Sequence, residues 1–268
     1  MERRLALILL FGCFMLMAAS GQNVVNKNYL RIYLWADEEA YPGLVEAETL
    51  QSGVIHERDE YEKAVLSVVP QEDEYVFDPE SRSDDAAAAK DDYIYAYSVL
   101  QMKKLAPYII NGMVYGWEFV YTPSDSTRGV SEYFEVKPLR DFSEERKLIK
   151  YETAIRENSK LHVWVSFKRN SQQRIYYQQW ADLQNQKISG IGSGKVEKGF
   201  AGINEACDEA LKVAVRGHFQ KIMRNKPKQI TGRVLISDIH GMTVDKGHYK
   251  VQLDFFLETV KIKEYNLF

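Results

Sequence analysis

The chain has 268 residues, of which 45% are hydrophobic and 27% are charged, so it is long enough to bury one large core or two small ones. This composition excludes a wholly disordered chain and a polytopic helical membrane protein. Lys and Arg total 35 against 38 Asp and Glu, which leaves a formal net charge of −3. The whole chain therefore offers no basic excess for binding nucleic acid.

Residues 1–21 have the features of a secretory signal peptide. Two arginines precede an apolar run over residues 5–17, and small residues follow it. Because this run is shorter than the ~20 residues that cross a bilayer, we expect cleavage before Gln22 and no membrane span afterwards. An alternative is a lipobox that ends at Cys13 and leaves this cysteine acylated at the new N-terminus.

Cleavage before Gln22 would leave Cys207 as the single cysteine of an exported chain, so an intramolecular disulfide could not form. Cys207 lies between Ala206 and Ala210 on an apolar helical stripe. Since buried thiols commonly act as small hydrophobic side chains, we predict that Cys207 packs in the core.

The N-terminal third contains a strand, a helix and an acidic linker. Residues 29–36 are rich in β-forming side chains, and residues 57–69 form a helical pattern that Pro70 ends. Residues 71–92 contain nine acidic side chains against two basic ones and lack glycine, which an EF-hand calcium loop requires. We interpret them as a solvated linker or loop.

The remainder of the chain alternates between helical and strand patterns. In chain order these patterns predict a helix at 93–105 that Pro107 ends, strands at 109–122 and 130–137, a helix at 144–156, strands at 161–168 and 174–188, a helix at 203–224, and strands at 230–239 and 248–262. Within the first of these strands, Tyr115, Trp117, Phe119 and Tyr121 share one face.

Two of the predicted helices are each followed by a β-hairpin. Residues 107–114 and 227–234 share the pattern P-x-x-I-x-G-x-V at the start of the two hairpins, which suggests a duplicated, pseudo-symmetric αββ unit. The fold class is therefore α+β, with antiparallel sheets packed on helices. The predicted organisation is a signal peptide at 1–21, an N-terminal segment at 22–70, the acidic linker at 71–92, a first helix–hairpin unit at 93–157 and a second α+β unit at 158–268.

The glycine-rich run at residues 190–195 does not fit a nucleotide-binding motif. A P-loop requires Gly where Ser189 stands and a hydroxyl where Val196 stands, and the dinucleotide motif requires Gly in place of Lys195. We interpret the run as a flexible connection between a strand and a helix.

The remaining candidate chemistry does not define a catalytic or metal site. The five histidines show no HExxH motif or paired spacing. Asp37, Glu38 and Glu39 follow a predicted strand, but adjacent acids do not supply the separation between two carboxyls that glycoside hydrolysis requires. We therefore predict no catalytic residue, no metal and no cofactor.

Three aromatic residues are the candidate ligand-binding positions. Tyr176, Tyr177 and Trp180 could form a flat platform for sugar rings or peptide side chains. The alternative is that these rings belong to the hydrophobic core or face a protein partner. Their solvent exposure distinguishes the two interpretations.

Two segments resemble known classes of exported protein. The segment 107–136, which contains the sequence NGMVYGWEFVYTPSDSTRGVSEYFEV, resembles uncharacterised exported envelope proteins of bacteria. The segment 189–257 is similar to the α/β modules of periplasmic accessory lipoproteins, which act as scaffolds or activators. Together they cover about half the chain, and the resemblance implies an envelope location and a non-catalytic role.

We therefore expect a periplasmic or outer-membrane associated protein that acts as a binding or scaffold module, with an envelope protein or a glycan as its partner. Its membrane association would be peripheral or through a lipid anchor. A glycan-binding module and a periplasmic hydrolase with dispersed site residues are the two alternatives.

Overall fold

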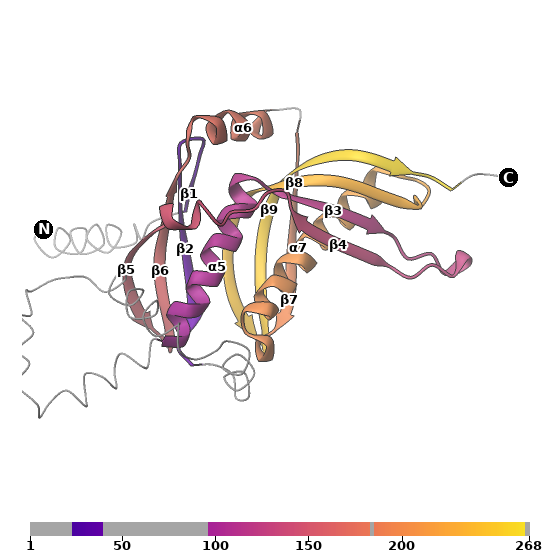
Figure 1. Ribbon diagram of the computed structural model, residues 1–268. Helices are drawn as coiled ribbons and strands as arrows, with labels where there is room; N and C mark the ends of the chain where they lie inside the picture. The colour runs from indigo at the N-terminus through magenta and orange to yellow at the C-terminus, as the bar shows by residue number, and fades with distance from the viewer. Residues whose placement is uncertain (1–22, 40–95, 183–184, 266–268) are drawn as a thin grey trace, which may run out of the picture.

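The computed structural model describes residues 23–39, 96–182 and 185–265. These residues form two antiparallel sheets and three α-helices, which confirms the predicted α+β class (Figure 1). The predicted leader at 1–21, the helix at 57–69 and the acidic linker at 71–92 lie outside the described residues.

The four-stranded sheet has the order β1-β2-β6-β5. Its strands are β1 (Val24–Val25), β2 (Tyr29–Asp37), β5 (Lys150–Glu157) and β6 (Lys160–Lys168). In β6, Leu161, Val163, Val165 and Phe167 are buried on one face, as their alternation predicts. Helix α5 (Ala96–Val114) packs against β2 and β6.

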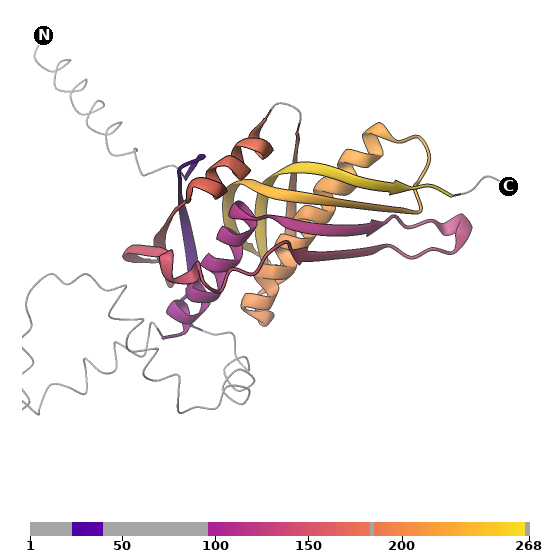
Figure 2. The same cartoon turned by 45° about the horizontal axis from the view of Figure 1, so that its top comes forward.

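The five-stranded sheet has the order β4-β3-β8-β9-β7. Its strands are β3 (Trp117–Thr122), β4 (Tyr133–Pro138), β7 (Gln186–Lys195), β8 (Gln229–Asp245) and β9 (His248–Lys263). Helix α7 (Phe200–Ile222) packs on β7 and β9, and α5 lies between this sheet and the four-stranded sheet (Figures 1 and 2). One hydrophobic core consequently runs through both sheets.

Helix α6 (Ser171–Ala181) packs on the opposite face of the five-stranded sheet from α7. There Trp180 forms a second hydrophobic cluster with Leu235 and Phe256. Three short 3₁₀ segments complete the fold: η1 (Ser126–Arg128), η2 (Arg146–Leu148) and η3 (Val196–Lys198).

Helix α5 extends nine residues beyond its predicted end at residue 105, through Pro107 to Val114. The prediction of a strand from residue 109 was therefore wrong over its first part, and Tyr115 lies outside β3. A proline inside a helix removes one backbone hydrogen bond, but Ile109, Ile110 and Met113 are all buried against the core. Their burial outweighs the cost of the proline.

Two further predictions of secondary structure were wrong. The predicted helix at 144–156 is the short segment η2 followed by β5, because pairing with β6 overrides the local helical preference. The predicted strand at 174–188 is largely α6. A capping box between Asn170 and Gln173 starts this helix, with both reciprocal hydrogen bonds at 2.9 Å.

The glycine-rich run is not a flexible connection but lies within β7. A Cβ atom on Gly190, Gly192 or Gly194 would lie about 2 Å from a backbone oxygen of α7. The facing positions of α7 are also small: Gly202, Ala206, Ala210 and Ala214. The glycines therefore allow close packing between a strand and a helix.

In the structure, as predicted, a helix precedes each β-hairpin: α5 comes before β3 and β4, and α7 comes before β8 and β9. The two hairpins belong to one sheet, because β3 pairs with β8. The sequence pattern that suggested a duplication does not mark equivalent positions. Residues 107–114 lie inside α5, whereas residues 227–234 lead into β8.

Candidate functional site

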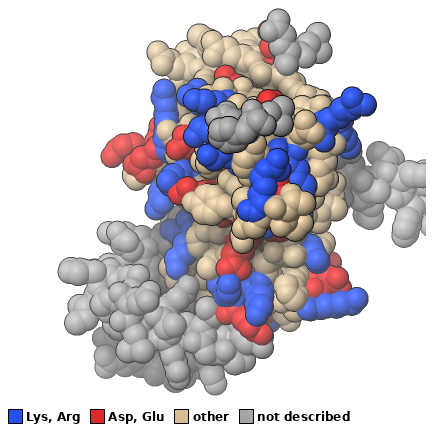
Figure 3. Space-filling model, turned by 90° about the vertical axis from the view of Figure 1, so that its right-hand side faces the viewer, with Lys and Arg blue, Asp and Glu red and all other residues tan. Residues whose placement is uncertain are grey.

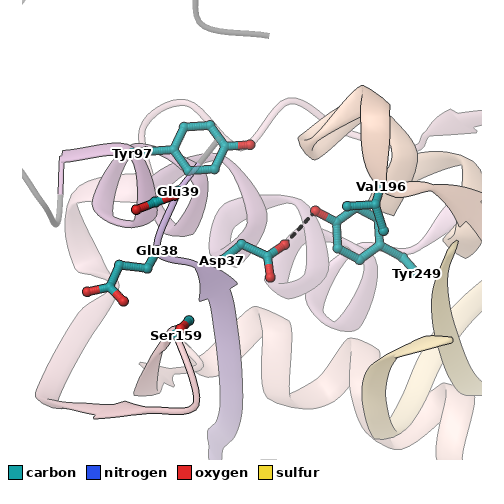
Figure 4. Close-up of a pocket in the computed structure, with 7 residues that line it drawn as sticks. All are labelled: Asp37, Glu38, Glu39, Tyr97, Ser159, Val196 and Tyr249. Atoms are coloured by element: carbon teal, nitrogen blue, oxygen red, sulfur yellow. Dashed lines mark hydrogen bonds between the residues drawn. The ribbon is translucent and has the colours of Figure 1, made fainter. Parts of the chain in front are cut away.

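A pocket of about 290 Å³ lies at the C-terminal end of β2, where the two sheets meet (Figure 4). Its lining is Asp37, Glu38, Glu39, Tyr97, Ser159, Val196 and Tyr249. The acids come from β2 and the residues after it, Tyr97 from α5, Ser159 from the β5–β6 turn, and Tyr249 from β9. The volume is close to the lower limit for small-molecule sites.

Hydrogen bonds hold the end of β2 to three other parts of the chain. The Glu38 backbone N–H donates to the Ser159 carbonyl at 3.0 Å, and the Ser98 hydroxyl donates to the Asp37 carbonyl at 2.8 Å. Nearby, the Trp35 indole donates to the Met242 carbonyl at 2.7 Å. The pocket is therefore built on fixed elements of both sheets.

A tyrosine and a carboxylate connect the two sheets inside the pocket. The Tyr249 hydroxyl donates to Asp37 Oδ2 at 2.8 Å. Burial is the main cause that raises the pKa of Tyr249, and the Asp37 charge raises it further. Tyr249 consequently stays protonated at neutral pH and acts as a donor to Asp37.

The three acids of the pocket have different environments. Glu38 is 5% exposed and forms an ion pair with Arg156 at 2.7 Å. Asp37 is half-buried and Glu39 is exposed. The pocket thus offers carboxylate acceptors beside two phenol rings, which favours a ligand that carries hydrogen-bond donors or a positive charge.

The hairpin does not bring His240 and His248 together. His240 Nε2 lies 2.7 Å from Asp254 Oδ2 across β8 and β9, outside the pocket, and this hydrogen bond raises the pKa of His240. The register of the hairpin pairs His248 with Asp245, several residues along the strand from His240. Over the described ranges, the structure contains no group of three or more His, Cys, Asp or Glu residues that could hold a metal.

The three predicted ligand-binding residues all lie on α6. Trp180 is 5% exposed and packs against Leu235 and Phe256. The Tyr176 hydroxyl donates to the Tyr115 carbonyl at 3.1 Å. These contacts attach α6 to the five-stranded sheet, and a ligand-binding role for the three rings stays a prediction.

Tyr177 covers a buried arginine. The Arg169 guanidinium lies 4.3 Å from the centre of the Tyr177 ring and donates to the Met113 carbonyl at 2.8 Å. Burial lowers the pKa of Arg169 to about 10, so it still carries its charge at neutral pH. A cation next to the last carbonyls of α5 is favourable for the helix dipole.

Cys207 is fully buried in α7, and burial raises the pKa of its thiol. This confirms the predicted packing role, because the thiolate that reacts as a nucleophile is disfavoured there.

The three acids of the pocket stood out in the sequence as a run after a strand, but we predicted no site there. Tyr97, Ser159 and Tyr249 carry no local signal of a site, since tertiary structure alone brings them to the end of β2. Asn158 and Ser159 form the turn between β5 and β6 with positive φ angles of 52° and 56°. The usual sequence signal of such a turn is a glycine, and neither residue is one.

The fold and the pocket define an α+β protein with an acidic, tyrosine-lined cavity between two antiparallel sheets. The chain belongs to an uncharacterised family, whose model matches residues 18–265. It is 25% identical to an uncharacterized protein of Treponema pallidum (strain Nichols) over 167 residues, which cover 62% of this chain and 70% of that protein. No solved structure matches the chain.

Proposed function

We propose that this protein is an exported, non-catalytic binding module of the cell envelope and that the pocket at the end of β2 is its ligand site. The observation that carries the proposal is the convergence of Asp37, Glu39, Tyr97 and Tyr249 from different elements on one cavity. Concave sites in which a few polar groups converge are the usual location of small-ligand binding. The ligand class is a molecule with a protonated amine or several hydroxyls, such as an amino sugar.

The geometry favours binding over hydrolysis. A glycoside hydrolase requires one carboxyl that keeps its proton beside a second, ionised carboxyl. Arg156 pairs with Glu38, and Tyr249 donates to Asp37, so both carboxyl groups already have a partner within the protein. The carboxyl whose pKa burial raises to about 6 is Asp208 on α7, which is not part of the lining.

The ligand class can be tested by calorimetry with two sugars that differ in charge. Glucosamine oligosaccharides carry protonated amines at mildly acidic pH, whereas N-acetylglucosamine oligosaccharides have the same rings without the charge. We expect the first to bind and the second to bind at least ~10-fold more weakly, because a charged hydrogen bond is worth roughly 1.5–3 kcal/mol.

Two variants make this test specific to the pocket. Glu39→Gln removes an exposed carboxylate from the lining, and Glu118→Gln removes an exposed carboxylate from β3. We expect weaker binding only for Glu39→Gln. Equal binding of both oligosaccharides, or equal loss in both variants, would refute the assigned site.

Catalysis and export have separate tests. Mass spectrometry of the oligosaccharides after incubation should show unchanged chain lengths, and shortened products would support the hydrolase alternative.

Intact-mass measurement of the protein from envelope fractions should show an N-terminus at Gln22, or at acylated Cys13 if the lipobox is used. Recovery from the cytosol with Met1 still attached would contradict export.

A further inference from the structure

The near-neutral charge of the whole chain conceals a strong separation of charges. Residues 40–95 hold 15 acidic and 4 basic side chains, and residues 1–22 hold one acidic and two basic ones. This leaves 29 Lys and Arg against 22 Asp and Glu in the described residues, a net charge of +7. From residue 210 to residue 237 there are seven basic residues and no acidic one.

Contacts bring together, at one end of the molecule, three segments that each carry Lys or Arg side chains. Lys226, in the α7–β8 connection, donates to the Ser124 carbonyl of the β3–β4 loop at 2.9 Å. Arg128 of that loop lies 4.4 Å from the centre of the Tyr265 ring, and the Lys228 N–H donates to the Lys263 carbonyl at 2.8 Å. Figure 3 looks at this end and shows several groups of Lys and Arg side chains on it, with Asp and Glu side chains between them.

Six exposed side chains at this end, which we call the basic end, have no carboxylate partner among the described residues. They are Lys221, Arg224, Lys226, Lys228, Lys261 and Lys263. The nearby acids are already engaged: Asp125 by Arg128, Glu132 by Arg216 and Glu258 by Arg233. Within the part of the chain that the structure describes, the exposed Glu264 is the acid at this end that lies outside these ion pairs.

Exposed aliphatic side chains lie at the same end, where Val260 and Ile262 alternate along β9 with Lys261 and Lys263. Ile222 is 59% exposed, Val260 is 56% exposed and Ile262 is 37% exposed. Such side chains gain little from a nucleic-acid backbone, whereas they can enter the boundary between headgroups and acyl chains of a bilayer. Five of the six cations are lysines, which act as point charges and lack the bidentate geometry with which arginine recognises phosphates specifically.

We infer that the basic end docks the protein on a membrane surface rich in anionic phospholipid. Clusters of four to eight basic residues beside apolar side chains are typical of such surfaces. Each cation near an anionic membrane is worth about 1 kcal/mol, or roughly fivefold in affinity.

The test is co-sedimentation of the purified, processed protein with vesicles of phosphatidylglycerol and phosphatidylcholine, compared with vesicles of phosphatidylcholine alone. We expect binding to the anionic vesicles, and loss of this binding as salt rises from about 0.1 M to 1 M and the Debye length falls from about 10 Å to 3 Å. The double variant Lys228→Glu/Lys261→Glu should bind at least ~10-fold more weakly.

Two matched variants separate this mechanism from its alternatives. Lys150→Glu/Lys168→Glu reverses two exposed charges on the four-stranded sheet and should bind almost as well as the wild type. Ile222→Ser/Val260→Ser keeps all charges and should weaken binding to anionic vesicles about tenfold, because it removes apolar groups that enter the bilayer. Circular dichroism verifies that each variant is folded.

Several results would overturn the inference: equal binding to both kinds of vesicle, equal loss in the two charge-reversal variants, or no effect of the serine substitutions. A single-stranded oligonucleotide or an acidic peptide that binds more tightly than the anionic vesicles at the same salt concentration would also overturn it, in favour of that ligand. None of these results depends on the pocket, which lies at the other end of the β8–β9 hairpin.

Discussion

Asp208 should make the protein less stable at neutral pH than an uncharged side chain would. It is half-buried on α7, and its Oδ1 lies 3.4 Å from the Tyr108 hydroxyl. Burial raises its pKa from the usual 3.8 to about 6, although the bond from Tyr108 opposes the rise. The folded protein therefore carries an ionised carboxylate at pH 7.5 in a place that disfavours charge.

The sign and size of the effect follow from the difference in pKa. Between about pH 4 and pH 6 the folded state holds a proton that the unfolded chain has lost, so the free energy of unfolding falls as the pH rises through this window. A difference of about two pKa units corresponds to roughly 3 kcal/mol. We expect Asp208→Asn to increase the free energy of unfolding at pH 7.5 by up to that amount.

Urea denaturation followed by tryptophan fluorescence can measure this gain at about pH 7.5 and at about pH 4. The advantage of Asp208→Asn over the wild type should be nearly absent at the lower pH, where Asp208 is protonated. Glu197→Gln, at an exposed position next to the same helix, is the control and should change stability little at either pH. A loss of stability at pH 7.5, or a gain of equal size at both pH values, would refute the argument from burial.

Two further substitutions test the packing and a surface ion pair. Gly192→Ala should destabilise the protein by several kcal/mol or prevent folding, because its Cβ would lie 1.9 Å from the Ala206 carbonyl oxygen. The control is Gly217→Ala, whose Cβ would meet no atom within 4 Å. In thermal unfolding this variant should be as stable as the wild type or more stable by about 1 kcal/mol. For His240, NMR titration should give a pKa above the usual 6.5. The ion pair between His240 and Asp254 should therefore stabilise the folded state fully below about pH 6.5, and this stabilisation should disappear as the pH rises through the raised pKa of His240. An unchanged pH profile of unfolding in His240→Asn would contradict this role.

Elements with a strong internal period could be predicted from the sequence. Helix α7 has apolar residues at helical spacing along its length, and the structure ends it at Ile222, close to the predicted residue 224. The strands β2 and β6 alternate in the same way that their burial does. In these elements the local pattern and the tertiary environment agree.

The errors occur where tertiary contacts outweigh local signals. Pro107 would end an isolated helix, but the buried face of α5 continues past it. The strand β5 starts within a segment that has a good helix N-terminus, yet its pairing with β6 decides the outcome. The start of α6 could have been found, because Asn170 and Gln173 have the spacing of a capping box.

The pocket could be predicted only in part. A run of acids at the end of a strand indicates charge at a sheet edge, which drew attention to residues 37–39. The contacts of the acids in the cavity depend on Arg156 and Tyr249, and these residues are more than 100 positions away. No short-range pattern contains that information, since it depends on how the two sheets pack.

The β8–β9 hairpin places the two proposed sites at its opposite ends. Tyr249 lies beside the turn of the hairpin, whereas Lys263 pairs with Gln229 at its open end, 14 residues further along β9. At about 3.3 Å per residue this is roughly 45 Å of strand. A protein held on a membrane by its basic end would therefore present the acidic pocket away from the bilayer, so charge reversal at Lys228 and Lys261 should leave ligand binding in the pocket unchanged. If the same substitutions abolished both activities in a folded variant, the two sites could not be independent.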